Sequence, residues 1–264
     1  MDIVMQGGIW PGTLETAEYY LTIPIVEDVI ISTMSGEEIK QENPRIKIIK
    51  CLWPQNRGQG NMNLQIITSL QGLLRCEAVE AVKTRTDQRI LDLDKMNDYI
   101  SLQPGLNHFT PTFSPIDYIY VLGIQNNFPF STQDHVFWGF TSDLIALFDI
   151  PLNTEPVTGG WSKSEWGKHV QADKGLNFDV HLRMPIYLAA HYYAKFDPIV
   201  SRFLENWQEY LTDHASKRDE AMEVWNEIKE SVFKPFPKID MWWEKMKSAY
   251  PYEMYESQGE YYAT

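Results

Sequence analysis

The residues best suited to chemistry lie in Ala81–Gln88, where an apolar, β-prone run ends in Thr84-Arg85-Thr86-Asp87. Ligands of α/β proteins bind beyond the carboxyl ends of the strands, so a carboxylate at this position is a candidate metal or nucleotide ligand. Asp87 can hold a divalent cation through oxygen, and Arg85 can pair with a phosphate. Asp residues at strand ends are also common without a catalytic role, and the spacing alone leaves that alternative open.

The chain opens with a similar arrangement, because the apolar run Ile3–Met5 leads to Gln6 and then to Gly7-Gly8. Glycine lets the backbone approach a ligand closely, although a plain strand-to-helix turn would look the same. The segment is not G-x-G-x-x-G, and no G-x-x-x-x-G-K-[ST] occurs in the chain. A dinucleotide fingerprint and a P-loop kinase are therefore both disfavoured.

Two further segments are rich in polar residues. The loop Asn56–Asn63 precedes a predicted helix, so its Asn side chains can cap that helix and the helix N-terminus can bind an anion. An ordinary Gly-rich capped loop is the alternative. The D-x-D string Asp92-Leu93-Asp94 lies at a predicted helix start or loop, where we interpret both carboxylates as solvated.

Two other carboxylates are candidates for acid–base chemistry. Asp134 precedes a short apolar run, and it can accept hydrogen bonds from substrate hydroxyls or act as a base. Glu165 follows Ser164 at a predicted helix start, a position that suits a general base facing a cleft. The structural alternatives are a turn Asp and a Glu that interacts with the helix dipole.

The elements that position these residues alternate between strand and helix up to about residue 150. The predicted strands are Asp2–Gln6, Val29–Thr33, Ile46–Leu52, Val79–Thr84, Tyr118–Gly123 and Val136–Trp138. The predicted helices are Thr16–Leu21, Asn63–Arg75 and Leu144–Phe148, the last capped by Ser142-Asp143. This alternation predicts an α/β fold with a mostly parallel sheet and flanking helices.

The pattern becomes helical after about residue 160. Helices are predicted over Ser164–Gln171, Leu182–Ala194, Ile199–Leu211 and Ser216–Val232, and Phe233–Lys238 is broken by proline. We therefore divide the chain into an α/β part, 1–155, and a helical part, 156–264, and expect both to share one core.

Composition excludes some partners. The net charge is −13, which argues against nucleic acid, because the phosphate backbone needs a cationic surface. Two cysteines fit a reducing compartment better than a disulfide framework, and Ile3–Met5 is too short for a signal peptide. We expect a soluble, cytoplasmic protein. Nine Trp, 14 Tyr and 12 Phe suit either a Trp-rich core or sugar and base stacking.

Five segments, in the correct order, resemble the WavE-like family of glycosyltransferases, which is associated with lipopolysaccharide and surface-glycan synthesis. The similar segments are Ile3–Gly7, Val29–Thr33, Asn61–Ile66 with Gly72-Leu73, Val82–Asp87, and Asp134–Gly139 with Asp143-Leu144. The resemblance covers residues 1–170, and the helical C-terminal third gives no match. Leu64 stands where the family often has Arg, and the usual D-x-D is reduced to Arg85-Thr86-Asp87.

The resemblance implies a GT-A-like fold that transfers a sugar from a nucleotide diphosphate sugar, a UDP-sugar first of all, to a hydroxyl of a glycan acceptor. It implies donor contacts from Gln6, Gly7, Thr33, Asn61, Asn63, Gln65, Arg85 and Asp87. Asp87 would also ligate a divalent cation, Mn²⁺ or Mg²⁺, which with Arg85 would neutralise the departing diphosphate. Glu165 is the first choice for a catalytic base and Asp134 the second.

Two other functions stay open. The missing second Asp and the many aromatic residues also fit a non-catalytic glycan-binding protein on a decayed transferase fold. A nucleotide-sugar hydrolase or nucleotidyltransferase could use a similar sheet. Near the C-terminus, Trp242, Trp243, Met246 and Tyr250 alternate with lysines, which suggests weak peripheral contact with an anionic membrane, although packing on the domain is the alternative.

Overall fold

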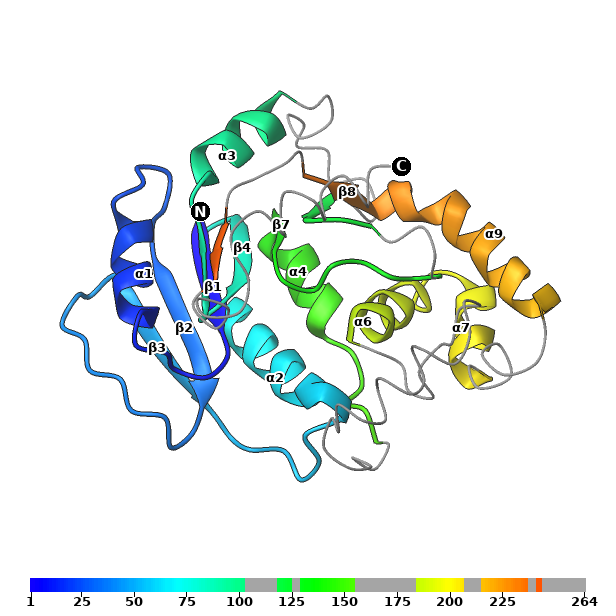
Figure 1. Ribbon diagram of the computed structural model, residues 1–264, viewed down its shortest axis with the longest axis horizontal. Coiled ribbons are helices and arrows are strands. Elements are labelled where there is room, and N and C mark those ends of the chain that lie inside the picture. The colour runs from blue at the N-terminus through cyan, green and yellow to red at the C-terminus, as the bar shows by residue number, and fades with distance from the viewer. Residues whose placement is uncertain (103–117, 125–128, 155–183, 207–214, 237–240, 244–264) are drawn as a thin grey trace.

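The computed structural model describes residues 1–102, 118–124, 129–154, 184–206, 215–236 and 241–243. Its centre is a seven-stranded sheet in the order β3-β2-β1-β4-β7-β6-β8 (Figure 1). The strands are β1 Asp2–Gln6, β2 Val29–Met34, β3 Ile46–Cys51, β4 Glu80–Arg85, β6 Ile119–Val121, β7 Phe137–Phe140 and β8 Phe233–Pro235. A second, two-stranded sheet pairs β5 (Gln88–Ile90) with β9 (Met241–Trp243).

The strands β3, β2, β1 and β4 are all parallel to their neighbours. Strand β7 runs antiparallel to both β4 and β6, and β8 is parallel to β6. The predicted α/β class and its mostly parallel sheet are thus confirmed. Because the four parallel strands end on the same side, their carboxyl ends form one edge of the sheet.

Helices cover both faces of the sheet. Successive residues of a strand point to opposite faces, so Ile3 and Ile31 belong to one hydrophobic cluster and Val4 and Ile30 to another. The helices α1 (Thr13–Leu21) and α3 (Leu93–Ser101) pack on the first face, and α2 (Met62–Leu73) and α4 (Thr141–Phe148) on the second.

Helix α2 lies very close to the sheet at Gly72. A Cβ atom added to Gly72 would lie 2.5 Å from Cγ1 of Val4, nearer than real Cβ contacts come. The helix follows the short 3-10 turn η1 (Gln59–Asn61). The missing side chain at Gly72 thus lets the C-terminal part of α2 pack directly on β1. Nearer the N-terminal end of the helix, Thr68 Oγ1 donates a hydrogen bond to Gln6 Oε1 at the carboxyl edge of the sheet.

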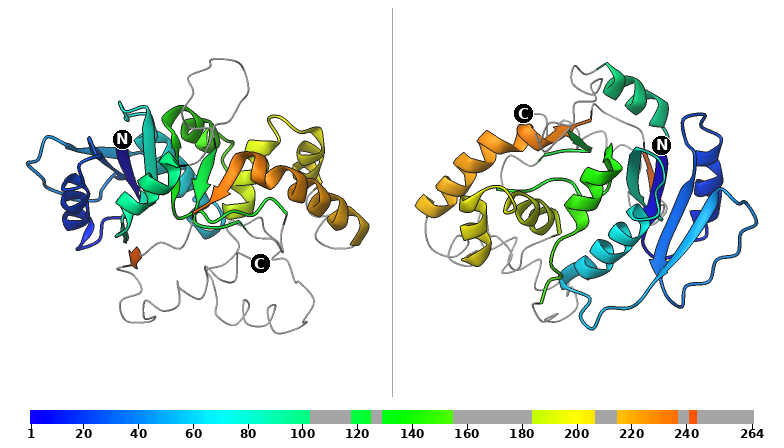
Figure 2. Two further views of the ribbon diagram at one scale, coloured as in Figure 1. Left: turned by 90° about the horizontal axis from the view of Figure 1, so that it is seen from above. Right: turned by 180° about the vertical axis from the view of Figure 1, so that it is seen from behind.

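Three of the four helices predicted for the C-terminal part are present, with bounds that differ by a few residues. They are α6 (Met184–Tyr193), α7 (Pro198–Glu205) and α9 (Ala215–Val232). The fourth prediction, Ser164–Gln171, lies outside the described residues. Figures 1 and 2 show α7 and α9 at the opposite end of the molecule from α1.

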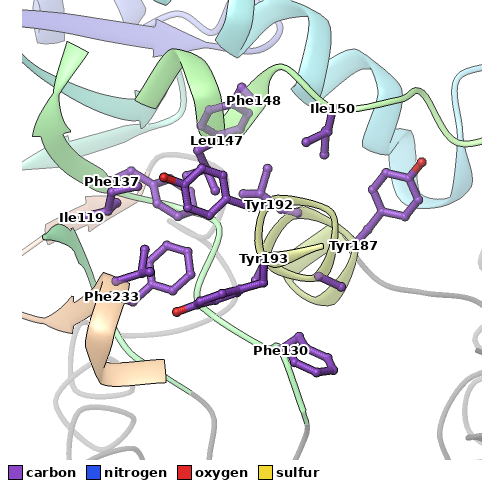
Figure 3. Close-up of a cluster of buried hydrophobic side chains, with 14 of the residues drawn as sticks. Ile119, Phe130, Phe137, Leu147, Phe148, Ile150, Tyr187, Tyr192, Tyr193 and Phe233 are labelled. Carbon is purple, nitrogen blue, oxygen red and sulfur yellow. The ribbon is translucent and has the colours of Figure 1, made fainter. Parts of the chain in front are cut away.

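Aromatic side chains fill the space between α6 and the sheet. Figure 3 shows Phe137, Tyr192, Tyr193 and Phe233 gathered there, with Phe130 farther from the sheet, and all five are buried. Their hydrophobic cluster contains residues from before and after position 155. The boundary at residue 155 itself stays a prediction.

One local prediction about α4 is wrong. The predicted cap of α4 by Ser142-Asp143 is absent, because β7 runs directly into the helix and Phe140 occupies the N-cap without a side-chain bond. Asp143 lies in the first turn instead, where a carboxylate favours the helix dipole. The helical pattern ends before the segment that was predicted to be broken by proline, and the first residues of this segment form β8, which ends at Pro235. Pro235 is tolerated because β8 is an edge strand, where a missing N–H costs little.

Candidate functional site

The candidate site lies at the carboxyl ends of β1, β2 and β4, where several of the predicted donor contacts converge. The turns after β1 and β4 are joined by two hydrogen bonds: the Thr86 N–H donates to Gln6 O at 3.0 Å, and Thr86 Oγ1 donates to Gly8 O at 2.6 Å. Gly7 has φ 130°, and a Cβ there would lie 2.8 Å from Thr86 Oγ1. Only glycine fits both the conformation and the space.

Two other predicted donor contacts are buried at this edge. Gln6 is 5% exposed, and its Oε1 accepts a hydrogen bond from Thr68 Oγ1 on α2 at 3.1 Å. Thr33 is fully buried near the end of β2, and its hydroxyl has no hydrogen-bond partner within the described part of the chain. An unsatisfied buried hydroxyl is costly, which makes Thr33 a candidate for a bond to a ligand or to an ordered water.

Arg85 and Asp87 form a bidentate ion pair. Arg85 Nε and Nη2 donate to the two carboxylate oxygens of Asp87, each at 2.9 Å. The Asp87 side chain is 2% exposed and that of Arg85 is 25% exposed. The sequence predicted both residues at this strand end, and in the structure their side chains bind each other.

This pairing does not favour a cation on Asp87. Both oxygens of Asp87 already accept from a guanidinium, and the described segments contain no group of three His, Cys, Asp or Glu side chains that could hold a metal. Divalent cations such as Mg²⁺ and Mn²⁺ prefer several oxygen ligands. The residues around Asp87 therefore do not fit a metal centre, and the metal cofactor stays a prediction.

Lys83 lies two residues before Arg85 and is fully buried in β4. Its Nζ donates to Asp134 O at 2.6 Å and lies 5.4 Å and 5.5 Å from the ring centres of Phe137 and Phe148. Burial lowers the pKa of Lys83 to about 7, although the negative charge of Asp134 opposes this shift. Lys83 thus anchors the turn that carries Asp134.

Asp134 is held from α2 as well. Gln65 Nε2 donates to Asp134 O at 3.1 Å and to Asp134 Oδ2 at 3.0 Å. Burial raises the pKa of Asp134, but His135, Lys83 and the bond from Gln65 together lower it more, so the net pKa lies below the usual value. A carboxylate that stays ionised is a good acceptor for a hydroxyl group and a weak general base.

The predicted donor contact Asn63 is used inside the protein. It is 1% exposed, and its Nδ2 donates to Asn153 O at 2.8 Å while its Oδ1 accepts from Asn153 N at 2.7 Å. Asn61 is exposed at the N-cap of α2 with φ 64°. Neither Asn caps α2 through its side chain, so that prediction is wrong. Their contact with a donor stays a prediction, and Glu165 lies outside the described residues.

Three members of this polar group were missed from the sequence: Lys83, Gln88 and His135. Lys83 carried a signal, because it is a charge in the middle of an apolar run that was predicted to be a buried strand. Gln88 and His135 carried none. They come together, with Gln88 Nε2 2.9 Å from His135 Nδ1, only because β5 folds back beside the start of β7.

Comparison with known proteins adds one structural likeness. No protein-family model matches this chain, and no curated protein matches it. The crystal structure of HddC from Yersinia pseudotuberculosis is similar over 59% of this chain and 81% of its own, with 12% sequence identity and a TM-score of 0.34. A likeness at this level carries no argument about function.

The region predicted to contact a membrane is partly described. Within the described segments, no helix is both long and apolar enough to cross a bilayer. The backbone of Met241–Trp243 forms β9, which pairs with β5 next to the candidate site. Both membrane contact and packing of these side chains on the domain stay predictions.

Proposed function

We propose that this protein is a glycosyltransferase that moves a sugar from a nucleotide diphosphate sugar to a hydroxyl of a glycan acceptor. The observation that carries the proposal is the convergence at one sheet edge of Gln6-Gly7, Thr33 and the Arg85–Asp87 pair. These lie in segments that resemble the WavE-like family, and they meet where α/β proteins bind their ligands.

In this proposal Arg85 meets the diphosphate. A guanidinium matches phosphate geometry and keeps its charge, so it can stabilise the negative charge that grows as the diphosphate leaves. Asp87 fixes the direction of Arg85 through both oxygens, at 2.9 Å each. Gly7 supports the proposal because its turn brings the chain after β1 against Thr86, between Arg85 and Asp87 in the sequence.

Asp134 binds a sugar hydroxyl in this proposal. Its carboxylate is ionised, partly exposed and fixed by Gln65, which are the properties of a hydrogen-bond acceptor that orients a substrate. Glu165 remains the first choice for the base that activates the acceptor hydroxyl. A UDP-sugar is the first donor to try, and the glycan acceptor is proposed by class alone.

The test is a panel of nucleotide sugars, scored by calorimetry for binding and by coupled assay for diphosphate release. Each donor is tested with a chelator, with Mg²⁺ and with Mn²⁺. Arg85→Ala should weaken donor binding at least about tenfold, because a charge-assisted contact to phosphate is lost. Arg75→Ala removes an exposed arginine beyond the C-terminal end of α2, at the opposite edge of the sheet, and should bind like the wild type.

The outcomes separate the three functions. Binding of one donor, weakened in Arg85→Ala and followed by acceptor-dependent release, supports the transferase. Release of free sugar without an acceptor would favour a hydrolase, and glycan binding without any donor would favour a glycan-binding protein. Equal donor binding by Arg85→Ala and the wild type would reject the proposed diphosphate contact.

A further inference from the structure

Gln88 is a buried polar residue that the proposed chemistry leaves without a role. It is 1% exposed and lies in β5, one residue after Asp87. The backbone of Gln88 pairs with that of Trp243 in β9, and two residues later the Ile90 N–H donates to Tyr20 Oη at 2.8 Å. The strand that carries Gln88 is thus fixed from the C-terminal strand and from α1.

The side-chain amide of Gln88 contacts one ring nitrogen of His135, and Asp134 faces the other. Gln88 Nε2 lies 2.9 Å from His135 Nδ1, and Asp134 Oδ1 lies 3.6 Å from His135 Nε2. A neutral imidazole has one N–H and one lone pair. Because an ionised carboxylate repels a lone pair, the N–H belongs on Nε2, and Nδ1 must then accept from an N–H of Gln88.

The orientation of this amide follows once Nδ1 is the acceptor. Gln88 Oε1 is buried, and within the described residues it has no hydrogen-bond partner. Turning the amide over would bring Oε1 against the lone pair of Nδ1 and would leave the amide N–H groups at the unsatisfied position instead. The contact with His135 therefore dictates which way Gln88 points, even though an acceptor is left unsatisfied.

We propose that Gln88 is a positioning residue, which holds His135 as the Nε2–H tautomer and so keeps a neutral donor facing the carboxylate of Asp134. A neutral N–H at 3.6 Å faces the carboxylate without neutralising its charge, and the charge stays available to a ligand. The tautomer follows from the contacts of the two ring nitrogens and from the negative charge of Asp134. Its use for a sugar hydroxyl rests on the proposed function.

The experiment is ¹⁵N NMR of the histidine rings in the full-length protein at neutral pH, with the His135 signals assigned from their loss in His135→Asn. The wild type should show His135 protonated at Nε2 and unprotonated at Nδ1. Gln88→Glu replaces the donor with a carboxylate of the same size, and the Nε2–H-only pattern should be lost. Gln71→Glu adds the same charge at an exposed position of α2 and should leave the pattern unchanged.

Each outcome decides the inference. A wild-type His135 that is protonated at Nδ1 would overturn it without any variant, so the test stands even if Gln88→Glu does not fold. An unchanged pattern in a folded Gln88→Glu protein would also overturn it. Donor binding is measured on the same samples. If the wild type binds no nucleotide sugar, the proposed function fails, whereas the ring spectra still decide the role of Gln88.

Discussion

The polar edge of the sheet and the aromatic region around α6 both bury ionisable side chains, but the charges near these side chains differ. His135 at the edge and His191 on α6 each have a pKa lowered to about 4, chiefly by burial. The charge of Asp134 opposes this shift at His135, whereas the charge of Lys195 adds to it at His191. His191 instead packs against Tyr187, with ring centres 4.2 Å apart.

In the proposed function, this difference separates residues that would serve a ligand from residues that serve packing. At the edge, each buried charge has an opposite charge or an oriented dipole nearby. A substitution there changes the electrostatic interactions more than it changes the packed volume. Around α6, the rings fill space, and removing one leaves a cavity. Variants in the two regions should therefore fail in different ways, and the four predictions below test this, from the largest expected effect to the smallest.

Trp225→Ala should cause the largest loss of stability. Trp225 is fully buried, with its ring centre 5.8 Å from that of Phe130 and 5.9 Å from that of Tyr193. Removing it should lower the free energy of unfolding by about 3–5 kcal/mol, as for other large buried aromatics. Urea denaturation measures the change. Phe196→Ala, at a ring that is 52% exposed, should cost under about 1 kcal/mol, and equal losses would contradict the comparison.

Lys83→Met should change the pH dependence of stability. The pKa of Lys83 is about 7 in the folded protein against 10.5 for an ordinary lysine, so between these values the unfolded chain binds more protons. The contribution of Lys83 to the free energy of unfolding therefore rises from pH 7 to 10.5 and is most unfavourable below pH 7.

The variant should remove this rise, which amounts to a few kcal/mol by the energy of a pKa unit. Its stability relative to the wild type should be greatest near pH 6 and should fall toward pH 10. Urea titrations across that range provide the measurement, and Lys40→Met is the matched control at an exposed lysine. A pH profile identical to that of the wild type would show that Lys83 keeps an ordinary pKa.

Asn63→Ala should lower stability more than it lowers donor affinity. The change removes both hydrogen bonds to the Asn153 backbone, at 2.7 Å and 2.8 Å. Leaving buried groups unsatisfied should lower the free energy of unfolding by about 1–3 kcal/mol. Thermal unfolding without the donor measures this loss, and calorimetry measures donor affinity separately. Asn61→Gly tolerates the same left-handed backbone at an exposed position and should cost little. Loss of donor binding at full stability in Asn63→Ala would instead assign Asn63 to the donor site.

His191→Gln should have the smallest effect. The free energy of unfolding of this variant should fall less in acid than that of the wild type. Because the folded pKa of about 4 lies below 6.5, the unfolded chain takes up the extra proton as the pH falls through this window, and stability is lost. The variant should lose less stability between pH 6.5 and 4, as followed by circular dichroism in urea at fixed pH steps. A steeper loss than in the wild type would mean that His191 is charged in the folded protein.

Much of the fold was predictable because its elements are strongly patterned. The runs Asp2–Gln6, Val29–Thr33 and Ile46–Leu52 match β1, β2 and β3 to within a residue at each end. The short strands were harder. Strand β5 has three residues and β9 another three, so neither shows a period, and their pairing joins positions far apart in the chain.

The candidate site was predictable in part, and for a similar reason. Arg85 and Asp87 were recognised because they end an apolar strand. Gly7 was recognised because a pair of glycines follows the apolar run at the start of the chain. Asn63 was expected at a ligand, yet its amide bonds the backbone of Asn153. A polar side chain looks the same in sequence whether it binds a ligand or closes a loop, and only the neighbours that folding brings to it decide between the two.

The sequence by itself determined the alternation of strands and helices, the parallel sheet, and the strand end that carries Arg85 and Asp87, because hydrophobic period and turn residues are local properties. Tertiary structure alone decided that Arg85 binds Asp87 through both oxygens, that Lys83 reaches the backbone of Asp134, and that Gln88 meets His135. The physical reason is that charge and hydrogen bonding at a buried site depend on distances between residues far apart in the chain, which no local pattern encodes.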